Sequence, residues 1–207
     1  MNHLMISLTF TSLMVSIVPV QSQRAGDQSN IPAEEYAIYA AVIGNMFVGG
    51  NDSLDPQSRV KMLVIEDRTV SNTFAAIAGE DEGKSLKQGF SSIISQEAID
   101  DYVAKNAKSH QLTNSLDLKL KYTLTPKEKI EQIFKSRPGS WYEFYRQFPN
   151  SNGYIGLSRA GLNSSGNQAI VYAQHFCGGL CGSGHYLLLV KKDKEWVVQK
   201  KVMAWIS

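Results

Sequence analysis

The chain has few of the residues that most often carry chemistry, and it lacks the motifs that would assign them to a reaction. Its 207 residues include 2 cysteines and 4 histidines. There is no His-Glu-x-x-His zinc motif, no Walker phosphate loop and no Gly-x-Ser-x-Gly nucleophile elbow. The glycines between Gly178 and Gly184 do not form a dinucleotide-binding fingerprint, because that motif joins a strand to a helix. No common catalytic class is therefore indicated.

The sequence also lacks an excess of charge of one sign. It has 21 basic and 19 acidic residues, which are interspersed and give a formal net charge of +2. A strong excess would indicate a partner of opposite charge, such as nucleic acid or an anionic membrane surface. The nearest approach to a basic patch flanks an expected hairpin turn, where lysines commonly protect a sheet edge. It consists of Lys191, Lys192, Lys194, Lys200 and Lys201. We therefore expect no nucleic-acid partner, and the sequence identifies no other partner.

Charged residues are absent from the N-terminal segment, residues 2–22. Residues 4–20 are apolar apart from Ser and Thr, and Ser22 supplies the small residue that signal peptidase prefers. We expect a signal peptide over residues 1–22, and hence a periplasmic or extracellular protein without a stable membrane anchor. A retained N-terminal anchor is the alternative, because His3 and no Lys or Arg precedes the apolar run.

The mature chain, residues 23–207, has the length of one domain and no internal repeat or low-complexity linker. Residues 71–92 have several glycines and few large apolar residues, so we expect mainly a loop there, with at most a short helix. The spacing of apolar residues predicts the other elements. We expect helices over residues 32–47, 95–107, 125–135 and 140–148, and strands over residues 60–66, 116–124, 154–159, 168–176, 185–191 and 196–206. The fold class is thus α+β, with N-terminal helices packed on a mainly antiparallel sheet that ends in a C-terminal β-meander.

The expected helix over residues 140–148 has an aromatic stripe formed by Trp141, Phe144 and Phe148. Such a stripe usually belongs to the core. We expect these three rings to be buried against the leucine side of the 116–124 strand or against the meander. An exposed aromatic platform for a ligand is the alternative.

Both cysteines and two of the four histidines lie within residues 175–185. If residues 176–184 closed a hairpin, His175 and His185 would face each other at its mouth. In an oxidising compartment the first interpretation is a disulfide between Cys177 and Cys181. Two alternatives stay open: unpaired, structurally idle cysteines, or a zinc or copper site formed by His175, Cys177, Cys181 and His185.

Four glycines make the same segment a candidate binding loop: Gly178, Gly179, Gly182 and Gly184. Gly178 and Gly179 would also give the backbone the freedom that so short a disulfide needs. The pattern Cys-x3-Cys-Gly-x2-His resembles the copper-binding loop of cytochrome oxidase subunit II, which likewise joins two strands. That resemblance is confined to the loop, because the chain has Leu188 and Tyr142 where the family has further copper ligands.

Six stretches spread over nearly all of the mature chain carry a wider resemblance. They are residues 35–39 (EYAIY), 63–69 (LVIEDRT), the aromatic helix up to Pro149, 157–163 (LSRAGLN), 169–172 (AIVY) and 201–207 (KVMAWIS). In these stretches the chain resembles an uncharacterised family of small exported bacterial proteins. The resemblance implies a periplasmic or secreted protein and brings no established activity, substrate or cofactor.

Two functional hypotheses follow. The first is a non-enzymatic binding or interaction module without a cofactor, because the core pattern is complete and no catalytic constellation is recognisable. The second is a metal- or thiol-dependent enzyme, a hydrolase or redox protein, centred on His175, Cys177, Cys181 and His185. A binding module should show an oxidised or buried loop and a separate exposed apolar or aromatic surface, whereas an enzyme should show these side chains open in a cleft.

Overall fold

The computed structural model of the chain describes residues 31–47, 61–71, 79, 81–135 and 140–207. Within these ranges, five α-helices and a seven-stranded, mainly antiparallel sheet form an α+β fold, as the sequence predicts. The expected signal peptide over residues 1–22 lies outside the described residues. None of the described helices combines the length and the apolar character that a membrane crossing requires.

The sheet has the strand order β2-β1-β3-β5-β6-β7, with β4 beside β5. Strands β2, β1 and β3 are parallel, and β3, β5, β6 and β7 are antiparallel. The bounds are β1 Met62–Glu66, β2 Lys121–Thr125, β3 Ser151–Leu157, β4 Gly161–Leu162, β5 Gln168–Gly178, β6 Cys181–Lys192 and β7 Glu195–Ile206. The expected meander is formed by β5, β6 and β7, which follow one another in the chain and in the sheet.

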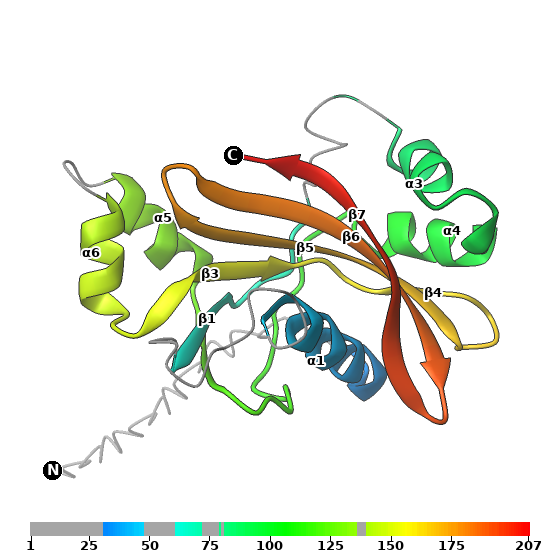
Figure 1. Ribbon diagram of the computed structural model, residues 1–207, viewed down its shortest axis with the longest axis horizontal. Helices are drawn as coiled ribbons and strands as arrows, with labels where there is room; N and C mark the ends of the chain where they lie inside the picture. The colour runs from blue at the N-terminus through cyan, green and yellow to red at the C-terminus, as the bar shows by residue number, and fades with distance from the viewer. Residues whose placement is uncertain (1–30, 48–60, 72–78, 80, 136–139) are drawn as a thin grey trace, which may run out of the picture.

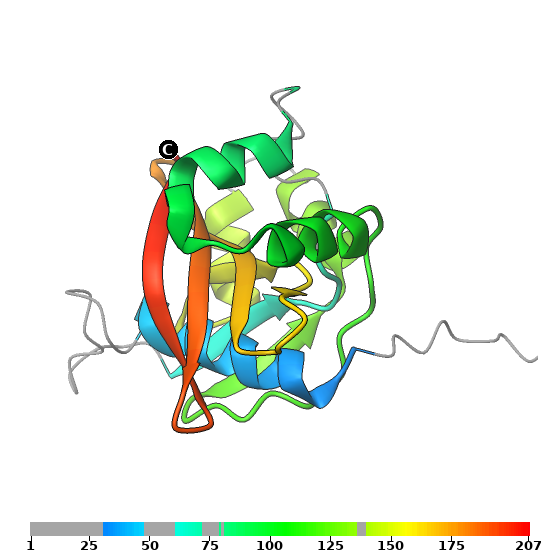
Figure 2. The same ribbon diagram turned by 90° about the vertical axis from the view of Figure 1, so that its right-hand side faces the viewer.

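The helices lie on both faces of the sheet (Figures 1 and 2). Helix α1 (Ala33–Phe47) covers one face and packs on alternate residues of the strands, such as Ile65 and Leu187. The opposite face is covered at one end by α3 (Glu82–Phe90) and α4 (Gln96–Lys105), and at the other end by α5 (Lys127–Lys135) and α6 (Ser140–Gln147). A 3₁₀ turn, η1 (Ser91–Ile93), links α3 to α4. The second face therefore carries two separate helix pairs.

The expected strand over residues 116–124 is shorter in the structure. Strand β2 begins at Lys121, and the preceding leucines reach the α1 side of the core from an irregular segment. Strand β1 has five residues and pairs with β2 from Met62 opposite Lys121 to Glu66 opposite Thr125. Among the described residues, no strand pairs with residues 116–120, so the alternation of leucines with polar residues there reflects burial on one side and not strand pairing.

The aromatic helix is buried, as expected, but its main partners differ in part from those expected. Phe144 is fully buried and Phe148 nearly so, whereas Trp141 is half-buried. The rings pack on Val64 of β1 and Tyr154 of β3, not on the leucines before β2. The segment expected to be mainly loop contains the nine-residue helix α3, whose first turn is capped because Lys84 N donates to the Asp81 carboxylate at 2.7 Å.

Candidate functional site

The predicted disulfide is present at the tip of the β5–β6 hairpin. Cys177 and Cys181 are bonded, with their Cα atoms 5.1 Å apart. Strand β5 runs on to Gly178 and β6 begins at Cys181, so the two strands are joined by a tight turn of Gly179 and Leu180. Neither thiol is free to act as a nucleophile or as a metal ligand in this state.

The two histidines do not face each other, which corrects the expected geometry of the hairpin mouth. His175 is paired with Ser183, and His185 is paired with Ala173. The expected geometry assumed a loop over residues 176–184; the strands instead continue almost to the turn, which shifts the register by two residues. His175 Nε2 contacts the backbone carbonyl of Asn152, and burial together with nearby Lys201 lowers the pKa of His185.

The candidate metal site is therefore not assembled in this state. Across the ranges that the structure describes, no three or more His, Cys, Asp or Glu side chains are grouped so that they could hold a metal ion. His175, Cys177, Cys181 and His185 lie near one another along the hairpin, but the cysteines bond to each other.

The candidate glycine-rich binding loop is partly filled by the protein itself. A Cβ atom on Gly184 would overlap the indole nitrogen of Trp205, and one on Gly182 would lie 3.1 Å from the same ring. Trp205 lies on β7, next to β6, and occupies the room that these two glycines leave. Gly179 faces open space, and neither it nor Gly178 adopts a positive φ, so the disulfide does not depend on glycine-specific backbone freedom.

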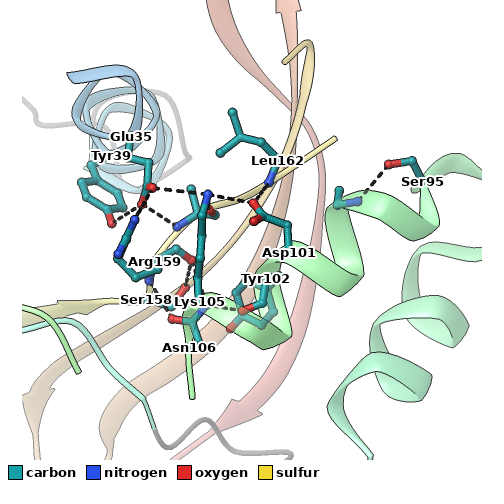
Figure 3. Close-up of polar contacts among 12 residues, drawn as sticks. Glu35, Tyr39, Ser95, Asp101, Tyr102, Lys105, Asn106, Ser158, Arg159 and Leu162 are labelled. Atoms are coloured by element: carbon teal, nitrogen blue, oxygen red, sulfur yellow. Dashed lines mark hydrogen bonds and ion pairs between the residues drawn. The ribbon is translucent and has the colours of Figure 1, made fainter. Parts of the chain in front are cut away.

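The most extensive buried polar cluster joins α1 to the segment that follows β3 (Figure 3). Arg159 Nε and Nη2 donate to the two carboxylate oxygens of Glu35 at 2.8 and 2.7 Å. The backbone N–H of Ala160 and the hydroxyl of Tyr39 also donate to Glu35 Oε2, and Lys105 Nζ lies 3.5 Å from Oε1. The Glu35 carboxylate is fully buried with its acceptor sites occupied. Adjacent acids such as Glu34 and Glu35 are usually interpreted from sequence as a solvated face, because neighbours on a helix point apart; this interpretation is wrong for Glu35.

The same cluster continues into α4. Asn106 donates to the carbonyls of Tyr102 and Arg159 and accepts from Arg159 N, while Lys105 pairs with Asp101 at 2.7 Å. Because these groups satisfy one another, the cluster fixes the positions of the elements and offers little to a ligand.

A different polar group, Glu66, lines a cavity of about 430 Å³. The cavity lies over β1, β3 and β5 and beside α5, on the sheet face that carries the two helix pairs. Its polar lining is Glu66, Ser71, Lys127, Glu131, Tyr154 and Gln174, and its apolar lining is Val70, Ile130, Phe134 and Phe176. Because β1 and β2 are parallel, Glu66 at the end of β1 lies next to the start of the helix that follows β2, at the sheet edge where α/β proteins commonly bind ligands.

The Glu66 side chain has no hydrogen-bond or ion-pair partner among the described residues, although the residue is only 7% exposed. Loss of solvent on burial raises the pKa of its carboxyl to about 7; Lys127 opposes this shift, and Asp67 and Glu131 add to it. Burial, Glu66 and Glu131 likewise raise the pKa of Tyr154. A strongly perturbed carboxyl in a cavity is a recognised mark of a functional site.

Half-buried aromatic rings continue from this cavity across the sheet. Ring centroids are 6.2 Å apart between Trp141 and Tyr154, 5.1 Å between Tyr154 and Phe176, and 5.2 Å between Phe176 and Trp205. Phe176 and Trp205 meet across β6 because Gly182 and Gly184 place no side chain between them. We call these four rings the aromatic row.

A second cavity, of about 470 Å³, lies beside α1. It is lined mainly by apolar residues of α1, of the segment before β2 and of β7, such as Ile43, Leu118 and Trp196. Its charged lining residues, Asp117 and Lys119, are exposed to solvent, so it gives less indication of a specific polar ligand than the Glu66 cavity.

Sequence reasoning missed the Glu66 cavity because adjacent acids, here Glu66 and Asp67, are more often a solvated face than a functional pair. Asp67 does find partners, since its carboxylate accepts from Lys127 N and from Gln111. One signal pointed to Glu66: it ends a continuous apolar strand, and continuous apolar strands are usually buried on both faces.

Comparison of the chain with protein-family models, with curated proteins and with solved structures found no match.

Proposed function

We propose that the protein is an exported binding module whose ligand occupies the Glu66 cavity. The observation that carries this proposal is a largely buried carboxyl that has no hydrogen-bond partner among the described residues and lines an open cavity beside the aromatic row. A buried charge without a partner destabilises a fold, so a buried unpaired carboxyl in a native protein commonly binds a ligand or takes part in a reaction. Export is supported by the uncharged N-terminal segment and by the disulfide, which persists in oxidising compartments.

The binding interpretation is favoured over an enzyme centred on the hairpin. A thiol-dependent reaction would need a free thiolate, and a metal site would need ligands that converge. The hairpin has a disulfide and histidines in different registers, and the half-buried aromatic row runs from the Glu66 cavity to this hairpin. The oxidised hairpin supports a binding module over a thiol- or metal-dependent enzyme.

The proposal is tested by screening small molecules against the mature chain with backbone NMR. We expect some compounds to shift the amide signals of Glu66, Tyr154 and Gln174. Glu131→Trp should block the cavity with a large side chain and abolish these shifts. The matched control is Glu128→Trp, because Glu128 is exposed on the same helix and does not line the cavity. A screen in which no compound class affects these signals, or in which Glu131→Trp binds as well as the control, overturns the proposal.

A further inference from the structure

The described lining of the Glu66 cavity carries more negative than positive charge. Two carboxylates, Glu66 and Glu131, face it with one ammonium group, Lys127. Lys127 and Glu131 are exposed, so solvent weakens their field, whereas Glu66 is largely buried and its charge, when the carboxyl is ionised, is screened less. A ligand that enters the cavity therefore meets a net negative charge concentrated on Glu66.

The remaining lining suits a positively charged group attached to an apolar body. The rings of Phe134, Tyr154 and Phe176 line the cavity, and aromatic rings attract cations as well as apolar groups. The amide of Gln174 accepts from the Tyr172 hydroxyl through Oε1, which leaves its NH₂ group for a polar atom of the ligand. An anionic ligand would meet two carboxylates and a single solvated lysine.

Resting on the proposed function, we infer that the ligand of the Glu66 cavity carries a protonated amine, which pairs with the Glu66 carboxylate while its apolar part packs on the aromatic lining. The amine supplies hydrogen-bond donors, which Glu66 lacks among the described residues, and a positive charge closer than that of the exposed Lys127. Two groups in one pocket, the carboxylate and the rings, define the ligand class.

Such pairing makes binding depend on pH. The ionisable groups around Glu66 are Lys127 and Glu131 of α5, Asp67 just after β1, and Tyr154 of β3; the β5 residue at the cavity, Gln174, is neutral. Because the pKa of the free Glu66 carboxyl lies at about 7, most of it is protonated at pH 6 and most is ionised at pH 8. Affinity for an amine should therefore rise about tenfold over this interval.

The test compares benzylamine, benzyl alcohol and benzoate, which share an aromatic ring and differ in charge. Binding to the mature chain is followed by NMR shifts at Glu66, Tyr154 and Gln174 between pH 6 and pH 8. We expect benzylamine to bind, more tightly at pH 8, and to bind better than the other two probes. Glu66→Gln, which keeps the shape and removes the charge, should weaken benzylamine binding about tenfold or more and remove its pH dependence. Glu128→Gln is the control for a charge lost elsewhere on α5.

The outcomes separate this inference from the proposed function. Equal binding of benzylamine and benzyl alcohol, tighter binding of benzoate, or an affinity unchanged by Glu66→Gln overturns the amine ligand but leaves the cavity as a binding site. If none of the three probes binds while another compound class shifts the same signals, the amine is likewise overturned and the site stands. If no compound of any class binds there, both fail. Thermal melting of Glu66→Gln checks that the variant is folded.

Discussion

Glu66 ends strand β1 inside the protein, where its carboxyl has lost solvent without gaining a hydrogen-bond donor among the described residues. The raised pKa of Glu66 follows mainly from this burial and not from its neighbours in sequence. Asp67, one residue later, accepts two hydrogen bonds and helps to fix the start of α5. Two adjacent acids thus have opposite roles, one structural and one available to a ligand.

The buried carboxyl should make stability fall as pH rises. In the unfolded chain the carboxyl has a pKa near 4.5, and in the folded protein it has a pKa of about 7. Protonated Glu66 is therefore favoured by folding, and this contribution is present below pH 4.5 and lost as pH rises through 7. The difference amounts to about 3 kcal/mol in the free energy of unfolding. Glu66→Gln removes this pH dependence. Between pH 4.5 and pH 8 the free energy of unfolding of the variant should therefore rise by about 3 kcal/mol relative to that of the wild type, measured by chemical denaturation.

Glu128→Gln, an exposed change on α5, is the matched control and should keep the same stability difference from the wild type at each pH. Parallel pH profiles for the wild type and Glu66→Gln would contradict the assignment of a raised pKa to Glu66.

At the scale of elements, the β5–β6 hairpin shows what sequence can and cannot predict. Both strands and the disulfide were predictable, because apolar alternation and an even cysteine count are local signals. The register was not, because it depends on how close to the turn the strands stay paired. A difference of two residues separates the histidines and removes the geometry of the expected metal site.

Gly182 and Gly184 of β6 leave room for the Trp205 ring of the neighbouring strand β7. Gly184→Ala should displace Trp205, because the new Cβ would overlap the indole ring, and should cost about 1–3 kcal/mol of stability. The tryptophan fluorescence should shift to longer wavelength as the ring becomes more exposed. Gly179→Ala is the matched control, since nothing lies within 4 Å of a Cβ there. Equal effects of the two variants would contradict the conclusion that the absence of a side chain at Gly184 makes room for Trp205.

Strand β2 also shows that a local pattern does not reveal strand pairing. The leucines from Leu116 onward alternate with polar residues as a strand would, yet pairing begins only at Lys121. The parallel pairing of β1 with β2 and β3 joins segments far apart in the chain, and no local pattern reveals it. The Glu66 cavity depends on this arrangement, so the candidate site was less predictable than the α+β fold class.

At the scale of the whole molecule, the Glu35 cluster connects the first helix to α4 and to the segment after β3. Arg159→Met would remove the two-pronged ion pair and leave the buried Glu35 carboxylate with Lys105 as its cationic neighbour, and should cost about 3–5 kcal/mol in the free energy of unfolding. Adding Glu35→Gln should restore part of the loss, because the buried charge is then removed. Urea denaturation of the two single variants and the double variant measures this coupling; strictly additive losses would show that the two side chains do not stabilise the protein as a pair.

The proposed export also predicts where the mature chain begins. The uncharged segment that ends in Ser22 predicts cleavage after that residue, so N-terminal sequencing of protein recovered from the periplasm or the medium should begin at Gln23. Recovery of a membrane-bound product that retains Met1 would contradict this prediction.

The ion pair between Glu35 and Arg159 also constrains how the protein is made, because it joins residues 124 positions apart. A chain that emerges N-terminus first presents α1 long before its partners exist, and β1 likewise precedes both of the strands that flank it. The contacts of α1 with Leu187 of β6 and with Arg159 can form only when the last third of the chain is present. Part of the apolar side of α1 therefore stays uncovered, and open to aggregation, until the last third of the chain completes the fold.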